Sequence, residues 1–496
     1  MTGRAANMGM NLTERILEAA APRGDKPAVI EASGAVSYGA LAQRIETARR
    51  ELSGAGVGNA LRVGLLADDS ANFIAVCFGL MAAGAAVVPI PPNLPPEEQQ
   101  TLARRVGLHA VAFAPGCPPA DLPGAAVRVR PPRQRLLSSG FVLRWVDRDA
   151  PSPAGFAELN PAFVRFTSGT TGDSKGVVLS HATILDRVQA ANAVLNIGPG
   201  DTILWVLPMA HHFAVTIVSY LLHGATIVLA GPPAEDAAAP LEAIRRHGAT
   251  VLYGPPPFYR RLCDAPRAAR LDTVRLALST TASLPAQTAR AFVSKYGVPV
   301  SNCYGLIEAG LPFINVARPR DKGASVGRAT PGYEARIVGA DGRPCPPGRT
   351  GDIHLRGPGL LDAYYTPWRT RAEILTDGWF HTGDVGRFDD EGFLTLAGRR
   401  GEIIACGGVT VFPTEIEHVL DAHPAVAESL VAGAADAGRG QVPVARVVLK
   451  GGIAAPPSES DLIAYCRARL SPEETPHRIE FVASLPRTPT GKLRRV

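Results

Sequence analysis

The residues whose types and spacing most clearly suggest a chemical function are 164–181, which read VRFTSGTTGDSKGVVLSH. Two apolar, strand-like stretches enclose a loop of glycine, serine and threonine that leads to Lys175. Glycines let backbone N–H groups converge on an anion, hydroxyls add donors, and a lysine adds positive charge. The loop therefore predicts a phosphate site rather than a solvated hairpin turn. It is not a Walker loop, because Ser174 precedes Lys175 and Gly176 follows it.

Two segments farther along the chain carry side chains suited to a nucleotide and a metal ion. SNCYGLIEAG offers an amide at Asn302, a flat aromatic face at Tyr304 and a hard oxygen ligand at Glu308. WFHTGDVGRFDDEGFLTLAGRRGEII offers Asp384, whose carboxylate suits ribose hydroxyls, and Arg399, whose guanidinium suits a phosphate.

Three other motifs fit either a structural or a functional role on their residues alone. In LPMAHHFAV, His211 and His212 lie where a strand meets a buried helix, a place that also suits a capping or core histidine. LALSTTASLP, residues 276–285, can be an ordinary turn from strand to helix. The chain ends in LPRTPTGKLRRV, and the basic tail around Lys492 can be merely solvated.

The order of these motifs resembles the AMP-forming adenylating superfamily, which includes acyl- and aryl-CoA synthetases, nonribosomal-peptide adenylation domains and firefly luciferase. The family pattern at the loop is roughly TSGTTGxPKG, and Ser174 stands here where proline is usual. The resemblance extends along nearly the whole chain. It implies an ATP-dependent carboxylic acid ligase, which forms an acyl-AMP with Mg²⁺ and then a thioester on CoA or on a carrier-protein phosphopantetheine.

The resemblance also implies roles for individual residues around the nucleotide. Asn302 faces the adenine amino group, Tyr304 stacks on adenine, Glu308 coordinates Mg²⁺, Asp384 binds the ribose, and Lys492 reaches the carboxylate and the α-phosphate. Lys175 and His211 complete the catalytic set. The remaining nucleotide-binding residues are Thr167, Ser168, Gly169, Thr170, Thr171, Gly172, Thr281, Ala282, Cys303, Gly305 and Arg399.

The acid and the thiol have implied sites as well. His211 matches a family histidine between the nucleotide and the acyl pocket, where amino-acid-activating relatives place an aspartate. We expect the pocket wall to carry no charge and therefore to favour an apolar or aromatic acid. Gly401 matches the family hinge, and Gly408 matches a glycine that lets a pantetheine arm pass. The expected pocket residues are His211, His212, Phe213, Pro256, Phe258, Cys303, Ala309 and Leu311.

One departure from the family pattern keeps other functions open. Ile307 stands where the family usually has a threonine that donates to the α-phosphate. Loss of one neutral hydrogen bond costs about 0.5–1.5 kcal/mol. The alternatives are an amino-acid-activating, carrier-loading adenylation enzyme and a catalytically impaired protein that binds acyl-AMP or ATP.

The elements that must position these motifs indicate an α/β fold. We expect two stacked α/β subdomains and a small β-subdomain, with residues 1–399 forming the N-terminal domain and 400–496 a small, mobile α+β domain. Residues 73–90 and 213–230 each read as helix, glycine turn and buried strand, so 73–90 is not a membrane span. Residues 115–153 read as an irregular, Pro-rich connection whose basic residues are solvated: Arg128, Arg130, Arg133 and Arg135.

Composition agrees with a folded enzyme. The chain has 496 residues with 46% hydrophobic and 19% charged residues, which excludes a mostly disordered protein. A net charge of +6, spread along the chain, suits a small polyanion better than nucleic acid. Seven cysteines without metal spacing, and a start that carries Glu14 and Glu18, predict a reduced, cytoplasmic chain without a signal peptide. We expect a monomer or a homodimer.

Overall fold

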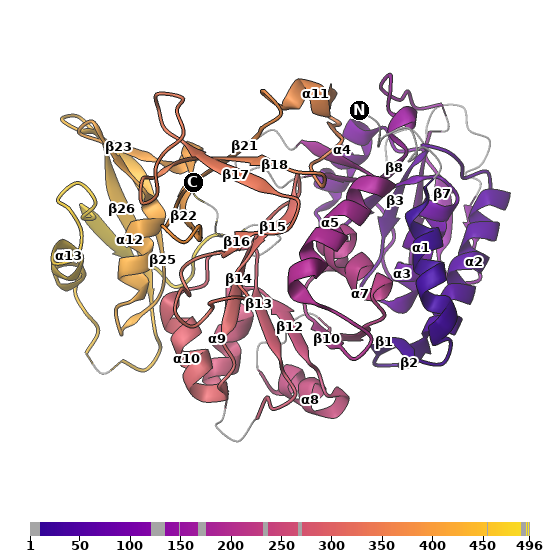
Figure 1. Cartoon of the computed structure of the whole chain (residues 1–496), viewed down its shortest axis with the longest axis horizontal. Helices are drawn as coiled ribbons and strands as arrows, with labels where there is room; N and C mark the ends of the chain where they lie inside the picture. The colour runs from indigo at the N-terminus through magenta and orange to yellow at the C-terminus, as the bar shows by residue number, and fades with distance from the viewer. Residues whose placement is uncertain are drawn as a thin grey trace.

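The computed structural model describes residues 10–120, 134–147, 149–166, 175–231, 237–265, 270–453, 455–487, 493 and 495. These residues form four sheets (Figure 1). Two nine-stranded sheets make up most of the N-terminal region, a four-stranded sheet follows, and a five-stranded sheet belongs to the last part of the chain. This is the mixed α/β architecture that the sequence predicts.

The first nine-stranded sheet carries the predicted phosphate loop. Its order is β20-β19-β9-β8-β4-β3-β5-β7-β6, with parallel pairing between β3, β4, β5 and β8. Helix α1 (Leu12–Ala20), α2 (Tyr38–Gly54), α3 (Ala71–Ala82), α4 (Pro96–Val106) and α5 (His181–Leu195) pack around it. Its strands are β3 (Arg62–Leu66), β4 (Ala86–Ile90), β5 (Ala110–Phe113), β6 (Gln134–Leu136), β7 (Val142–Trp145), β8 (Pro161–Phe166), β9 (Gly176–Ser180), β19 (Ala363–Tyr364) and β20 (Arg369–Thr370).

The second nine-stranded sheet carries the predicted nucleotide motifs around Thr281 and Asn302. Its order is β16-β15-β14-β13-β12-β10-β11-β1-β2. Its strands are β1 (Pro27–Glu31), β2 (Gly34–Ser37), β10 (Thr202–Trp205), β11 (Thr226–Leu229), β12 (Val251–Gly254), β13 (Leu276–Ser279), β14 (Val300–Leu306), β15 (Gly310–Ile314) and β16 (Arg328–Ala329). The helical segments of this region are α6 (Met209–His212), the π-helical segment Phe213–Ile217, α7 (Val218–Leu222), α8 (Ala238–His247), α9 (Pro256–Asp264) and α10 (Ala286–Tyr296).

Both predicted helix–glycine–strand units form. Helix α3 leads through Gly84 to β4, and α7 leads through Gly224 to β11. Each glycine has a left-handed backbone, with φ of +86° and +81°, which an L side chain adopts only at a cost. Over the described ranges, no helix is both long and apolar enough to cross a membrane.

The remaining two sheets follow in sequence order. The four-stranded sheet has the order β17-β18-β21-β22, from β17 (Glu334–Val338), β18 (Gly351–Arg356), β21 (Phe380–Phe388) and β22 (Leu394–Arg399); α11 (Arg371–Ile374) lies before β21. The five-stranded sheet forms from β23 (Ile404–Cys406), β24 (Val409–Val411), β25 (Val426–Asp436), β26 (Gly440–Leu449) and β27 (Arg478–Phe481). Helices α12 (Pro413–Asp421) and α13 (Glu459–Arg467) belong to this last part, at the left of Figure 1.

The largest hydrophobic core draws buried residues from both nine-stranded sheets and from helices α1, α3, α5 and α7. Trp205 on β10 and Tyr253 on β12 face this core, whereas Leu204 and Leu252 face a second core under α8, α9 and α10. Alternate residues of one strand point to opposite faces of a sheet. The second sheet is therefore covered on both faces.

The segment expected to be an irregular connection contains regular structure. Strands β6 and β7 form an antiparallel pair, and β7 also pairs with β5 at the edge of the first sheet. The alternation of buried Leu143 and Trp145 with half-buried Val142 and Arg144 is the strand signal in this stretch. Arg135 is exposed on β6, whereas Arg128, Arg130 and Arg133 lie outside the described residues.

Candidate active site

Strand ends of both large sheets carry the site. Strands β8 and β9 are antiparallel, and Phe166 pairs with Gly176 just beyond the predicted phosphate loop. The loop residues themselves, 167–174, lie outside the described part of the chain. Lys175 is exposed, and its Nζ lies 4.9 Å from the centre of the Tyr364 ring. The attraction between a cation and an aromatic face is weak, so the Lys175 ammonium group can leave the ring to bind a phosphate.

Glu308 lies at the turn between β14 and β15, and the surrounding chain fixes its backbone. Its carbonyl oxygen accepts from the Leu361 N–H at 2.7 Å and from Arg187 Nη2 at 2.7 Å. One side-chain oxygen, Oε1, accepts from the Tyr364 hydroxyl at 3.2 Å. Burial raises the pKa of the Glu308 carboxyl. A nearby cation would favour the ionised form again.

The environment of Glu308 fits a magnesium ion that arrives with phosphates. Mg²⁺ keeps several waters and is bound through one or two carboxylates together with substrate phosphates. Among the residues that the structure describes, no cluster of three or more His, Cys, Asp or Glu side chains could hold a metal ion. Glu308 and Lys175 both contact Tyr364, and a single carboxylate near a lysine agrees with such a site.

The ribose-side residues meet across two strands. Asp384 on β21 pairs in register with Arg399 on β22, and Arg399 Nε donates to Asp384 Oδ1 at 3.1 Å. The Tyr304 hydroxyl, from β14 of the other sheet, donates to Asp384 Oδ2 at 2.5 Å. These contacts orient the Asp384 carboxylate, and burial together with this carboxylate raises the Tyr304 pKa.

Asn302 is buried at the same end of β14. Its Nδ2 donates to the Gly323 carbonyl at 2.6 Å, which leaves the amide oxygen as the side-chain acceptor. An acceptor is the group that an exocyclic amino group of a base requires. Gly305, two residues beyond the buried Cys303, is exposed, so the chain here passes from the core to an open surface.

The turn after β13 contains a strained residue. Thr281 has φ of +75°, in the left-handed region that disfavours β-branched side chains. The next residue, Ala282, is exposed. Strained backbone tends to occur at binding sites, where the surrounding structure holds it in place. The observation is consistent with a nucleotide-side loop at residues 280–285.

His211 and His212 lie in α6, directly after β10. The Nδ1 atom of His211 lies 3.5 Å from Nη2 of Arg165, a residue on β8 for which the sequence analysis predicted no role. The His212 ring contacts Trp205 and Tyr253 edge-on, with centroids 6.0 and 6.2 Å apart. Both histidines are half-buried, so the part of the site around α6 is open to solvent.

The structure does not bring all expected acid-pocket residues together. Phe213 packs into the large core, where its ring stacks on Phe163 at 6.3 Å. Phe258 belongs to the second core on the other face of the sheet and contacts Tyr259 at 5.3 Å, and Pro256 precedes it in α9. The other three expected residues lie on the side of Phe213, in the large core: Cys303, Ala309 and Leu311.

The proposed hinge and thiol path lie after β22. Gly401 has a negative φ and nothing within 4 Å of the position of a Cβ, so this conformation makes no use of its freedom. Gly407 and Gly408 both have left-handed backbones, with φ of +58° and +84°, and also lie in open space. Lys492 lies outside the described residues.

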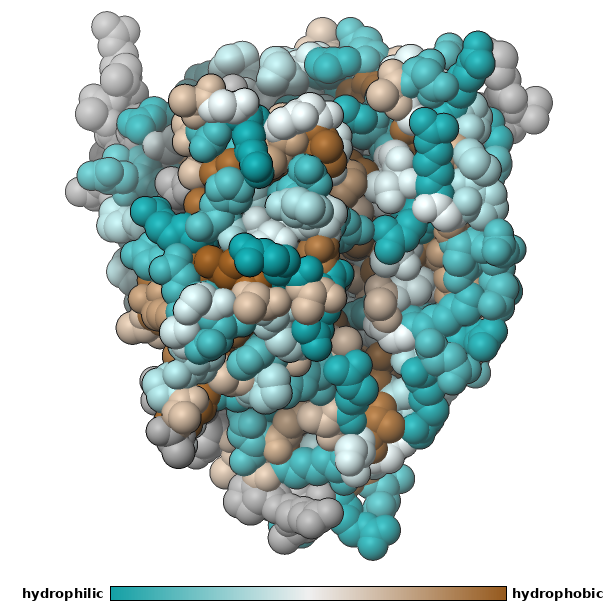
Figure 2. Space-filling model, turned by 90° about the vertical axis from the view of Figure 1, so that its left-hand side faces the viewer, coloured by the Kyte–Doolittle hydropathy of each residue, from teal (hydrophilic) through white to brown (hydrophobic). Residues whose placement is uncertain are grey.

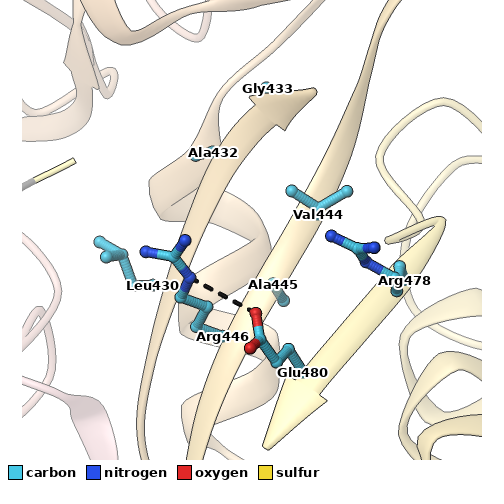
Figure 3. Close-up of a pocket in the computed structure, with 8 residues that line it drawn as sticks. All are labelled: Leu430, Ala432, Gly433, Val444, Ala445, Arg446, Arg478 and Glu480. Atoms are coloured by element: carbon cyan, nitrogen blue, oxygen red, sulfur yellow. Dashed lines mark ion pairs between the residues drawn. The ribbon is translucent and has the colours of Figure 1, made fainter. Parts of the chain in front are cut away.

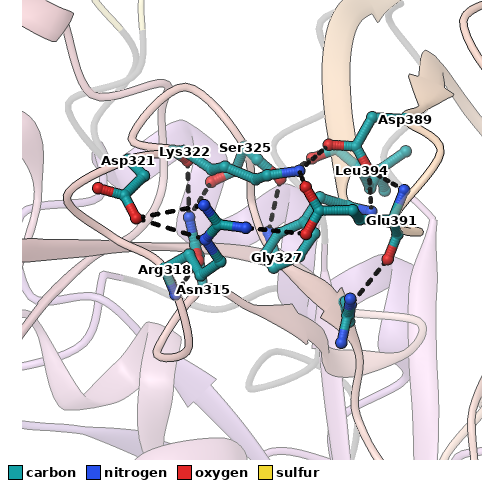
Figure 4. A network of polar contacts seen from close by, with 11 residues as sticks. Asn315, Arg318, Asp321, Lys322, Ser325, Gly327, Asp389, Glu391 and Leu394 are labelled. Carbon is teal, nitrogen blue, oxygen red and sulfur yellow. Dashed lines mark hydrogen bonds and ion pairs between the residues drawn. The ribbon is translucent and has the colours of Figure 1, made fainter.

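A polar network connects the Asn302 side of the site with the hairpin that carries Asp384 and Arg399 (Figure 4). Lys322 Nζ contacts Asp389 Oδ2 at 2.5 Å and Glu391 Oε1 at 2.7 Å, at the tip of the β21–β22 hairpin. Asn315 Nδ2 donates to the Lys322 carbonyl at 2.7 Å. The network therefore fixes the loop whose Gly323 carbonyl holds Asn302.

The hollow in Figure 3 belongs to the C-terminal sheet and contains none of the candidate site residues. Arg446 and Glu480 form an ion pair across it at 3.6 Å, so the charges of these two side chains compensate each other. Figure 2 shows this side of the molecule as largely hydrophilic, with hydrophobic residues in separate small groups. We assign the chemistry to the site at the strand ends.

The sequence motifs did not point to three residues of this site. Arg187 of α5 donates to the carbonyls of Ile307 and Glu308, at 2.8 and 2.7 Å. Tyr364 reaches Glu308 because β19 pairs with β9, far away in the sequence. Arg165 lies in a stretch whose pattern predicts only a strand. The one feature that could have indicated a role for it is a charged residue within an apolar run.

Comparison with known proteins agrees with this geometry. Residues 16–365 match the sequence model of the AMP-binding enzyme family, and residues 415–492 match that of the AMP-binding enzyme C-terminal domain. A sulfoacetate–CoA ligase of Cupriavidus necator is 32% identical over 95% of this chain and 94% of its own. An indoleacetate–CoA ligase of Aromatoleum aromaticum is 31% identical over 98% and 97%. The solved structure of the amide bond synthetase McbA from Marinactinospora thermotolerans superposes with a TM-score of 0.83, at 28% identity over 97% of each chain.

Proposed function

This chain belongs to the family of AMP-binding enzymes and is an AMP-forming acid–thiol ligase, and from this premise we propose its substrate class and the roles of its residues. The reaction joins a carboxylic acid to CoA at the expense of ATP. We propose that the acid is apolar or aromatic and that its carboxylate reacts beside His211.

The first step needs alignment and charge stabilisation. A carboxylate oxygen attacks the α-phosphorus of ATP, the bond to the β-phosphate oxygen breaks, and pyrophosphate leaves with the electron pair. The loop at 167–174, Lys175 and Lys492 hold the phosphates and the reacting carboxylate in this proposal. Glu308 would hold Mg²⁺, which would supply neutralisation of phosphate charge. Asp384 orients the ribose, and Asn302 accepts from the adenine amino group.

The second step needs a thiol to reach the same carbon atom. The thiol sulfur loses its proton to solvent and attacks the acyl carbonyl carbon, the bond from that carbon to the phosphate oxygen breaks, and AMP leaves with the electron pair. We assign Gly401 as the hinge about which the domain of residues 400–496 turns, and Gly408 as the point where the pantetheine arm passes. The open space around both glycines supports this assignment.

The observation that carries the acid class is an aromatic cluster behind His212. Trp205 and Tyr253 lie parallel, with ring centroids 6.0 Å apart and planes at 7°. Tyr220 of α7 meets Trp205 edge-on at 6.1 Å. These three rings are buried in the large core, so the side of the site at His212 is backed by aromatic and not by charged side chains, which favours a planar, apolar acid. The indoleacetate–CoA ligase named above acts on such an acid.

A screen of acids tests this function. The protein is incubated with MgATP, one acid at a time, with and without CoA, and pyrophosphate, AMP and thioester are measured. We expect turnover with aryl or arylalkyl acids and thioester only with CoA. Lys492→Ala should lower the rate of acyl-AMP formation about 10²-fold, while thioester formation from supplied acyl-AMP persists. A protein that binds ATP but releases no pyrophosphate with any acid would contradict the proposal.

A second candidate function concerns the acceptor only. McbA is an amide bond synthetase with the same fold, so an amine can replace the thiol in a protein of this architecture. The screen therefore includes amines and a phosphopantetheinylated carrier protein in place of CoA. An amino acid as the acid is disfavoured, because His211 stands where amino-acid-activating relatives place an aspartate.

A further inference from the structure

Arg165 is a cation at the centre of the candidate site that the proposed mechanism does not use. It is the second-last residue of β8, directly before the segment expected to bind phosphate. Phe163 and Arg165 point to the same face of β8, since side chains alternate along a strand. The Phe163 ring stacks on Phe213, and Arg165 Nη2 lies 3.5 Å from His211 Nδ1. The guanidinium therefore faces the histidine expected beside the reacting carboxylate.

Arg165 Nε lacks the acceptors that the buried Arg62 and Arg187 have. It shares this with Nε of Arg144 and Arg336, whose guanidinium groups instead lie over aromatic rings. Arg165 Nε is buried, and no described residue accepts its proton. Arg187, by contrast, donates to the carbonyls of Gly359, Ile307 and Glu308. Arg62 donates to the carbonyls of Gly107, Ala150 and Pro151. A buried donor without an acceptor is costly, so the site is built for an acceptor that a ligand brings.

The electrostatic surroundings favour an anionic ligand. Burial lowers the Arg165 pKa to about 10, Glu308 raises it and Arg187 lowers it. The group therefore stays charged at neutral pH. No carboxylate forms an ion pair with it in the part of the chain that the structure describes. Lys175 adds a further positive charge at the other end of the loop, directly before β9.

We propose that Arg165 binds the oxyanion at which the acyl–phosphate bond forms, through Nε and one Nη. This oxyanion is the carboxylate of the acid or the α-phosphate of ATP. The inference rests on the proposed function. It also accounts for Ile307: a charged donor from β8 replaces the hydroxyl that family members supply from the residue before the glutamate. Arg165 remains protonated throughout, because the leaving pyrophosphate takes the electron pair and no proton has to move.

Two substitutions of Arg165 separate charge from shape. Arg165→Gln keeps much of the side-chain length without charge, and Arg165→Lys keeps charge without the planar fork. We expect acyl-AMP formation to fall about 10²-fold in the glutamine variant and less in the lysine variant. Thermal stability should not fall in Arg165→Gln, since the unpaired buried donor is removed. Arg62→Gln is the matched control: it should lower the melting temperature and leave activity per folded enzyme unchanged.

Further measurements decide which oxyanion is bound. A higher KM for the acid with an unchanged ATP dissociation constant identifies the carboxylate. A weaker ATP complex in calorimetry identifies the α-phosphate. Either outcome supports the proposal. Added guanidinium ion should restore activity to Arg165→Ala but not to Lys175→Ala, which a purely structural role would not predict.

A substitution at Ile307 gives an independent test of whether Arg165 replaces the missing hydroxyl group. Ile307→Thr should raise the rate roughly threefold to tenfold in the Arg165→Gln background and less in the wild-type chain, since the two donors serve one oxyanion. Equal rates in wild-type and Arg165→Gln proteins would overturn the inference and leave the proposed function standing. Activity losses that only follow the folded fraction would overturn it as well. A wild-type protein inactive with every acid would overturn both.

Discussion

Single residues in the site adopt conformations that cost free energy, and Thr281 is the clearest. A β-branched side chain at φ of +75° is strained. Thr280, one residue before, has no left-handed backbone and is buried. The pair therefore offers a substitution and its control at neighbouring positions.

We expect Thr281→Gly to raise the free energy of unfolding by about 0.5–1 kcal/mol, because relief of the left-handed strain exceeds the entropy that glycine adds to the unfolded chain. Thr280→Gly should lower it by at least about 0.5–1 kcal/mol. Urea denaturation of both variants measures the difference. A loss of stability in Thr281→Gly would mean that side-chain contacts, and not backbone strain, dominate at this turn.

Residue types and spacing predicted part of the site and could not have predicted the rest. Asp384 and Arg399 fall in register on adjacent strands, as motifs at both ends of one hairpin should. Tyr364 contacts Glu308 only because β19 pairs with β9, a pairing between segments far apart in sequence. Motif position alone predicts Phe213 and Phe258 in one pocket. In the structure, Phe213 packs into the large core and Phe258 into the second core, because their helices cover opposite faces of the sheet.

At the scale of elements, one histidine connects α1 to the rest of the N-terminal region. The Leu12 N–H, in the first turn of α1, donates to Nδ1 of His181 at 3.0 Å, and His181 is only 1% exposed. Burial lowers the His181 pKa to about 4. Only the neutral ring can accept at Nδ1, so this contact requires the unprotonated form.

The contact predicts a pH dependence of stability. His181 takes up a proton in the unfolded chain below about pH 6.5 but in the native chain only near pH 4, so its contribution is full above pH 6.5 and is lost as pH falls. The loss is at most about 3 kcal/mol. His181→Asn keeps an acceptor and cannot titrate. We expect the wild-type protein to lose more stability than this variant between pH 7 and 5 in urea denaturation; identical pH profiles would refute the role.

The network in Figure 4 positions one element against another. Lys322 joins the loop after β15 to Asp389 and Glu391, and the next residue of that loop, Gly323, holds Asn302. Lys322→Met should therefore weaken ATP binding severalfold by letting Asn302 move, with little effect on the KM for the acid. Calorimetric titration with ATP measures this. Lys450→Met, directly after β26, serves as control, and equal affinities in the two variants would contradict the coupling.

At the scale of the whole molecule, the C-terminal domain touches the rest of the chain through polar contacts. Arg387 Nη1 donates to Glu415 Oε1 at 3.0 Å, and Arg260 of α9 lies 4.0 Å from Glu428. Within the C-terminal domain itself, Glu428 also pairs with Arg487, which precedes Lys492 by five residues. Exposed ion pairs of this kind are weak. Weak contacts of this kind are what the proposed movement of the domain between the two half-reactions requires.

The two glycines after the hinge allow a controlled test of that movement. Gly408→Leu should abolish thioester formation while pyrophosphate release with acid alone persists, because the side chain fills the thiol path. Gly407→Leu introduces comparable backbone strain one residue earlier and should leave thioester formation largely intact. Parallel assays of both half-reactions decide the matter. Equal effects of the two substitutions would remove Gly408 from the thiol path.

The interlocked order of the two large sheets has a consequence for synthesis on the ribosome. Strand β1 pairs with β11, some 200 residues later. Strand β9 pairs on its outer side with β19, which is also synthesised much later. At about 5–20 residues per second, β1 waits roughly 10–40 seconds for its partner. During that interval the nascent chain exposes unpaired strand edges, which are prone to aggregate. A cut between the sheets would leave each fragment without an edge strand, so the two fragments must fold together.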